Sequence, residues 1–331
     1  MAKPGAAYAP RKTKSKRPAP LQRKAAQIGA ALLLFLGTGL LLRFAGDGIC
    51  GLIAKGASLS NPAGVPGFAV ELIRLCILFV SLGLPLLFLR YACGLPLCEN
   101  GSPLRRVNGE TAAVWTGLFL PVIVAAVFLS SFLRFLLQSV FSAAPASGMS
   151  VPEGGFALFF SFLTVCALPA FFEELLFRGC IQTAFLPYGP RFAVLTTSLL
   201  FTLLHADVTQ LPGTFLLSYF LGWAAAATGG YALSMTLHLL YNGTAFILTY
   251  TGQHMMQAAG PMLAVILLVL YFMIGLSVFF TLRRSGRLPA GLARVKDPRN
   301  RQSRLELLLT SPGFSISLLA LVAYWVLRQL I

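Results

Sequence analysis

The chain has 331 residues, of which 57% are hydrophobic and only 11% are charged. Together with a mean hydropathy of +0.79, this composition excludes an ordinary soluble domain and is typical of a protein that crosses a membrane several times. The formal charge of +16 would also suit a nucleic-acid-binding protein. However, no basic patch interleaves with stacking aromatic residues, and the basic residues flank apolar segments instead. We therefore expect membrane lipids as partners and no nucleic acid.

The amino-terminal segment is basic and rich in proline and alanine. Residues 1–24 contain eight Lys or Arg side chains, and we predict that they form a disordered cytoplasmic tail. The apolar run that follows is too long for a signal peptide and lacks a small-residue cleavage site. We interpret it as the first membrane span.

Nine apolar stretches are candidates for membrane helices, because about 20 residues cross the hydrocarbon core. The sequence predicts an all-α polytopic membrane bundle of about eight or nine transmembrane helices. The expected spans are about 25–45, 69–92, 111–137, 156–185, 190–206, 212–228, 231–252, 260–282 and 312–330. They divide the chain after the tail into amino-terminal transmembrane helices 25–110, a central membrane domain 111–282, a basic cytoplasmic linker 283–311 and a carboxy-terminal transmembrane helix 312–331.

Charge placement predicts the orientation of these spans. With a cytoplasmic amino terminus, the loops that hold Arg90, Arg105 and Arg191, and the basic linker, all lie inside. Lys55 is then the only Lys or Arg in the outer segments 46–68, 138–155 and 253–259. This is the positive-inside pattern, so we expect the amino terminus in the cytoplasm.

The fourth expected span contains three charged side chains, Glu173, Glu174 and Arg178. Each would cost roughly 2.5–3.5 kcal/mol at membrane depth, which makes these groups functional candidates. Neighbouring helical residues diverge by about 100°, so the two glutamates cannot face one target. Residues four apart share a face. We therefore expect Arg178 to neutralise Glu174 and to leave Glu173 facing a cavity.

Further polar side chains follow in the central spans, namely His205, His238 and Asn242. The same four-residue spacing predicts that Phe201 lies beside His205 and that His238 lies beside Asn242. Counting the helical rise from the inner boundary puts Glu173 and these three polar groups within reach of one pocket below the membrane midplane.

A carboxylate, two imidazoles and an amide can activate water and stabilise an oxyanion. A carboxylate in a low-dielectric site can accept a proton from water near neutral pH, and N–H groups can donate to a tetrahedral intermediate. The same residues could instead hold zinc, although the helical His-Glu-x-x-His signature is absent. They could also relay protons in a transporter. Taken singly, each histidine or Asn242 is more simply an interhelical hydrogen-bonding residue.

Three short motifs in this region resemble a known family. Glu173-Glu174-x-x-x-Arg178, Phe201-x-x-x-His205 and His238-x-x-x-Asn242 occur in the order and spacing of the CAAX-processing and bacteriocin-processing (CPBP, or Abi) intramembrane proteases. The type II CAAX prenyl endopeptidases are their eukaryotic relatives. The motifs lie within about 156–250, and the domain that they imply covers about 110–280.

The resemblance implies an intramembrane endopeptidase in which Glu173 is the general base on water and His205 is its partner. His238 and Asn242 would stabilise the oxyanion, and Glu174 and Arg178 would support the site. It implies a glutamate mechanism with no metal cofactor, a peptide or lipidated protein as substrate, and a place in the bacterial inner membrane. Two alternatives use the same fold or residues, a zinc-dependent protease and a non-catalytic immunity or scaffold protein.

Overall fold

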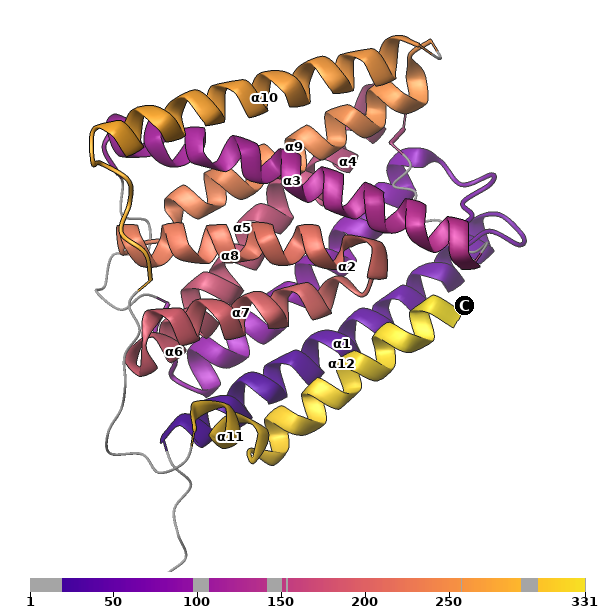
Figure 1. Ribbon diagram of the computed structural model, residues 1–331. Coiled ribbons are helices and arrows are strands. Elements are labelled where there is room, and N and C mark those ends of the chain that lie inside the picture. The colour runs from indigo at the N-terminus through magenta and orange to yellow at the C-terminus, as the bar shows by residue number, and fades with distance from the viewer. Residues whose placement is uncertain are drawn as a thin grey trace, which may run out of the picture.

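The computed structural model describes residues 20–97, 107–141, 151–152, 154–256, 258–292 and 303–330. Within these ranges the chain is helical and contains no β-strand, which confirms the all-α class. Five helices are long and apolar enough to cross a membrane, and Figure 1 shows them stacked as a bundle. The chain is therefore an integral membrane protein.

The helices agree with the expected spans to within a few residues, except that the first is longer. The amino-terminal helices are α1 (Pro20–Ile53), α2 (Gly67–Leu87), a π-helical turn η1 (Phe88–Ala92) and α3 (Gly109–Phe141). A continuous helical segment then comprises α4 (Gly155–Phe162), η2 (Leu163–Ala167), α5 (Leu168–Glu174), η3 (Leu175–Gln182), α6 (Thr183–Phe185) and η4 (Leu186–Tyr188). The remaining helices are α7 (Pro190–His205), η5 (Val208–Gln210), α8 (Leu211–Thr228), α9 (Ala232–His254), α10 (Ala259–Arg284), α11 (Arg304–Leu309) and α12 (Pro312–Leu330).

The segment from Gly155 to Tyr188 lies at the centre of the bundle and carries the charged residues. It is not a regular α-helix, because two π-helical stretches, η2 and η3, interrupt it. Pro169 explains the first, since proline lacks an N–H group and its ring clashes with the carbonyl one turn earlier, where η2 widens the helix. The second starts directly after Glu174, and all of its residues from Leu176 onward are buried. Such π-helical turns often accompany functional sites.

The two ends of the described chain pack against each other. Figure 1 shows α1 and α12 side by side along one edge of the bundle. A Cβ atom on Gly29 would lie 2.3 Å from the carbonyl oxygen of Gly313, so only glycine permits this approach. The short helix α11 buries Leu307 and Leu308 against the same edge.

The opposite edge of the bundle is formed by α10, which packs on α3 and α9. Only 6% of its most apolar stretch is buried inside the protein. A helix that is apolar on every side yet covered on so little of its surface is suited to contact with lipid.

Two expected boundaries differ from the structure. The first helix begins at Pro20, so residues 20–24 of the expected tail are helical, and it continues to Ile53 rather than to about 45. The rest of the tail, residues 1–19, lies outside the described residues, as does 293–302 of the expected linker. Arg283 and Arg284 belong to the last turn of α10.

Candidate active site

Glu174 and Arg178 form the buried ion pair that their spacing predicts. Arg178 Nη1 lies 3.1 Å from Glu174 Oε1, and the two side chains are 1% and 0% exposed. Arg178 Nη2 also donates to the backbone oxygen and to the hydroxyl of Ser218 on α8, both at 3.0 Å. A charge this deeply buried is tolerated only when it is paired and hydrogen-bonded. The pair therefore ties the central segment to α8.

His238, on α9, connects the two glutamates. Its Nδ1 donates to Glu174 Oε1 at 3.0 Å, and its Nε2 lies 3.9 Å from Glu173 Oε2. The first separation is a hydrogen bond, and the second is too long for one. Glu173 Oε2 has no hydrogen-bond partner among the described residues. Glu174 thus fixes the imidazole, and the opposite ring nitrogen faces Glu173 closely enough for both to contact one water molecule or substrate oxygen.

Phe201 is the packing centre of the site. Its ring lies 4.6 Å from the His205 ring and 5.8 Å from the His238 ring, measured between centroids. The Arg178 guanidinium carbon lies 4.8 Å from the centre of the same ring. An aromatic face attracts a nearby cation, so one buried phenyl group fixes both imidazoles and the arginine. The expected packing role of Phe201 is confirmed.

His205 is the last residue of α7, and its ring orientation is fixed by its own helix. Its Nδ1 donates to the backbone oxygen of Phe201 at 2.9 Å. In the neutral ring, Nε2 therefore carries the lone pair and acts as an acceptor. Ala206 follows with φ of 47°, a left-handed conformation that ends the helix there. Asp207 then caps the next turn by accepting from the Thr209 N–H at 2.9 Å.

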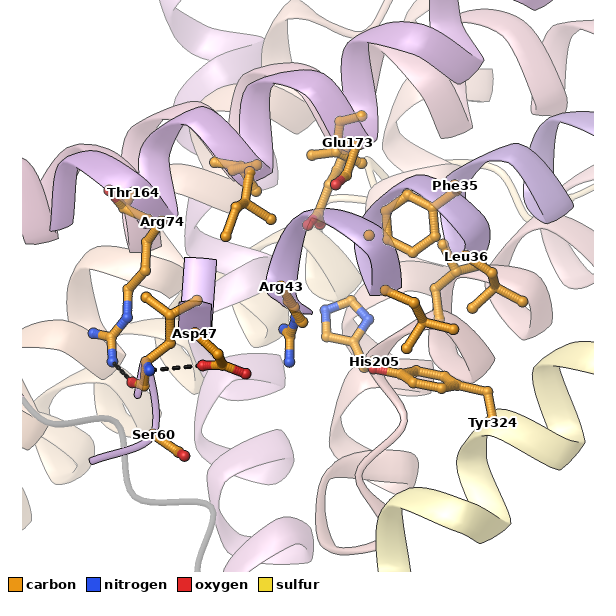
Figure 2. A pocket seen from close by; sticks show the side chains of 18 residues that line it. Phe35, Leu36, Arg43, Asp47, Ser60, Arg74, Thr164, Glu173, His205 and Tyr324 are labelled. Atoms are coloured by element: carbon orange, nitrogen blue, oxygen red, sulfur yellow. Dashed lines mark hydrogen bonds between the residues drawn. The ribbon is translucent and has the colours of Figure 1, made fainter. Parts of the chain in front are cut away.

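Glu173 and His205 line the same cavity, of about 610 Å³. Figure 2 shows both side chains at its wall, with Phe35, Arg43 and Tyr324 around them. The Glu173 side chain is 17% exposed, in contrast to its fully buried neighbour Glu174. The prediction that Glu173 faces a cavity while Glu174 is neutralised is thus confirmed.

Asn242 is the predicted site residue with the least direct connection to this cavity. Its amide donates to the Cys166 carbonyl oxygen at 3.4 Å, within η2, and it is not among the residues that line the cavity. It does share a helix face with His238, because both side chains contact the central segment. Its role as an oxyanion donor stays a prediction.

The sequence did not indicate which helices form most of the cavity wall. In the structure, α1, α2 and α12 form it, with residues that include Leu36, Leu78 and Tyr324. Apolar spacing reveals that a helix has a buried face but not which helix it packs against. The one available signal was a pair of charges four residues apart, Arg43 and Asp47, which both lie in α1 and line the cavity.

The grouping of the His and Glu side chains bears on whether the site could hold a metal ion. Across the described ranges, no three His, Cys, Asp or Glu side chains are grouped so that they could hold one ion. A catalytic zinc site needs three protein ligands with an open fourth position. The grouping in the structure is a chain of pairs, Glu173 with His238 and His238 with Glu174.

Comparison with known families matches residues 155–244 to the type II CAAX prenyl endopeptidase Rce1-like family. This stretch, the Rce1-like segment, is similar to that family. The match confirms the resemblance drawn from the three motifs, which lie within the matched residues. Comparisons with curated proteins and with solved structures found no match.

The Rce1-like segment contains every predicted site residue but does not include the whole cavity. It runs from the start of α4 into α9, whereas α1, α2 and α12 lie outside it. The predicted site residues therefore lie in the Rce1-like segment, and much of the cavity wall comes from helices outside that segment.

Proposed function

We propose that the protein is an intramembrane endopeptidase that hydrolyses a peptide bond of a membrane-associated substrate, with or without a lipid group, by glutamate-activated water. The observation that carries this proposal is the placement of the Glu173 carboxylate, which lines a cavity together with His205 and lies 3.9 Å from His238 Nε2. The motifs of the Rce1-like segment support the same assignment.

The proposed reaction gives each group a defined role. Glu173 takes a proton from water while His205 Nε2 accepts the other hydrogen bond of that water, and the oxygen attacks the peptide carbonyl carbon. With both its ring nitrogens protonated, His238 donates Nδ1–H to Glu174 and Nε2–H to the oxyanion of the tetrahedral intermediate. Glu173 then delivers its proton to the leaving nitrogen, the C–N bond breaks, and an acid and an amine are released.

Glu174 and Arg178 act on this reaction through His238. The Glu174 carboxylate holds the imidazole by its Nδ1, and Arg178 balances the charge of Glu174 in the buried interior. Asn242 is proposed as a second oxyanion donor, which requires its amide to leave the Cys166 carbonyl oxygen.

The experiment is cleavage of a peptide library by purified protein in lipid nanodiscs. We expect defined cleavage products with the wild type, and a loss of about 10²–10⁴-fold in rate for His205→Ala, because the water loses its positioning group. The same preparation is analysed for metal. Stoichiometric zinc that is required for activity would favour the zinc-dependent alternative, and pH-dependent solute flux without proteolysis would favour a transporter.

We further propose that eight or nine helices cross the bacterial inner membrane, with a cytoplasmic amino terminus. The support is the distribution of Lys and Arg, together with α7, α8, α9 and α12 as shorter or less apolar spans. In a cysteine-free background, Ser60→Cys should react with an impermeant maleimide in intact cells, whereas Ser285→Cys should react only in inverted vesicles. The reverse labelling pattern contradicts this orientation.

A further inference from the structure

One face of α1 lines the cavity. The residues that line it recur about every four positions along that helix, namely Phe35, Leu36, Gly39, Leu40, Arg43 and Asp47. This spacing is one helical stripe, so the wall changes from apolar to charged along a single direction. Because α1 lies outside the Rce1-like segment, the charged end is a feature of this chain rather than of its motifs.

Two of the three charged groups at that end are already paired. Arg74 Nη1 donates to Glu71 Oε1 at 2.7 Å, and its Nη2 donates to the Leu59 carbonyl oxygen at 2.8 Å. Asp47 Oδ1 accepts from the Leu59 N–H at 2.8 Å. These contacts fix the loop after α1 on the start of α2.

Arg43 differs from Arg74 and Asp47. In the described part of the chain, its guanidinium makes no hydrogen bond and no ion pair, although it is exposed to the cavity that Glu173 lines. A charge within an apolar span is disfavoured unless it faces a polar cavity or a partner. A planar guanidinium is also suited to binding a carboxylate through two parallel hydrogen bonds.

Packing between the helices sets the distance from Arg43 to the proposed reaction centre. A Cβ on Gly39 would lie 3.7 Å from Ser81 Oγ on α2. The rings of Phe79 and Phe172, which precedes Glu173, lie 5.1 Å apart. Glu173 is therefore approximately level with Gly39, and Arg43 lies one helical turn, about 6 Å, farther along α1. An extended peptide advances about 3.3–3.6 Å per residue, so this offset corresponds to roughly two residues.

We propose that Arg43 binds a carboxylate of the peptide substrate and so selects a cleavage site a few residues from that anion. This inference rests on the proposed peptidase function and assigns Arg43 a role in specificity rather than in chemistry. The shared ligand chemistry is a carboxylate, which can be the free carboxyl terminus of the substrate or an acidic side chain near the cleaved bond.

The test compares three forms of one peptide that the wild type cleaves: a free carboxyl terminus, a carboxyl-terminal amide, and an amide with one acidic residue added on the released side. We expect Arg43→Gln to raise KM for the carboxylate peptides about 10–100-fold, with little change in kcat. The amide peptide should be cleaved equally poorly by both proteins. Whichever carboxylate peptide shows the Arg43-dependent KM identifies the source of the anion.

Lys55→Gln is the matched control, because it removes one exposed cation near the same end of α1 but outside the cavity. It should leave KM for all three peptides unchanged. The proposal is overturned if Arg43→Gln affects the acid and amide peptides equally, or neither. A loss of thermal stability for Arg43→Gln only in nanodiscs containing phosphatidylglycerol, with an unchanged acid-to-amide ratio, would instead assign Arg43 to a lipid phosphate and overturn it.

A binding experiment tests the role of Arg43 independently of the proposed peptidase activity. A fluorescent form of each peptide is titrated against Glu173→Gln and against the double variant Glu173→Gln/Arg43→Gln. Tighter binding of the carboxylate peptide that disappears in the double variant supports the role of Arg43 even if the wild type proves unable to cleave. Equal binding of the acid and amide peptides by Glu173→Gln overturns it even if cleavage is observed.

Discussion

Replacing Glu173 by glutamine should lower the rate of peptide cleavage about 10²–10⁴-fold without loss of the fold. The amide has the shape of the carboxylate but cannot accept a proton from water. Stability should be retained, since Glu173 is partly exposed to the cavity and its Oε2 makes no hydrogen bond among the described residues. Initial rates on a peptide identified from the library, together with thermal unfolding in the same nanodiscs, measure the two effects.

The control for Glu173→Gln is Glu110→Gln, which removes a carboxylate at the start of α3. Glu110 is 62% exposed and forms a surface ion pair with Arg287. Such pairs contribute little to stability, so both activity and unfolding should match the wild type. Activity of Glu173→Gln within a few-fold of the wild type would remove the glutamate mechanism. A cellular function that survives the substitution in full would favour the non-catalytic immunity or scaffold alternative.

The second large effect is expected at Arg178. Arg178→Met leaves the fully buried Glu174 carboxylate without its cation, and breaking a buried pair in this way costs about 3–5 kcal/mol of unfolding free energy. The loss should also lower kcat, because Glu174 orients His238. Reversible unfolding in mixed detergent micelles, followed by intrinsic fluorescence, measures the change.

A double variant distinguishes loss of the pair from loss of packing. Adding Glu174→Gln to Arg178→Met removes the uncompensated charge, so part of the stability should return, and the coupling energy follows from the cycle of single and double variants. Arg284→Met, at an exposed position at the end of α10, should change stability by no more than about 0.5 kcal/mol. A double variant no more stable than Arg178→Met would show that the charge is not the cause.

Local spacing predicted the contacts that lie within one helix. The pair of Glu174 with Arg178, and the packing of Phe201 beside His205, follow from residues four apart on one helix. Most helix limits followed to within a few residues, because hydrophobic length is a property of the sequence itself, but the first helix extends beyond its expected span at both ends.

Contacts between helices could not be predicted in the same way. The sequence grouped His238 with Asn242, but it did not indicate that Glu174 would hold the His238 ring or that Ser218 would hold Arg178. Nor could it reveal the π-helical stretches, since the first of them, η2, depends on how Pro169 is accommodated by neighbouring helices. Which helices wall the cavity is likewise decided by packing.

The participation of α12 in the cavity has a consequence for biosynthesis. Tyr324 lies more than a hundred positions after His205 in the chain, yet the two line one cavity. Because a ribosome makes α12 after every polar residue of the site, the nascent protein carries all its reactive groups before their enclosure is finished. Docking of α12 on α1 through the contact of Gly29 with Gly313 then completes the chamber. Completion of the cavity is thereby coupled to insertion of the late-synthesised α12, and a chain stalled before α12 emerges lacks that part of the cavity wall.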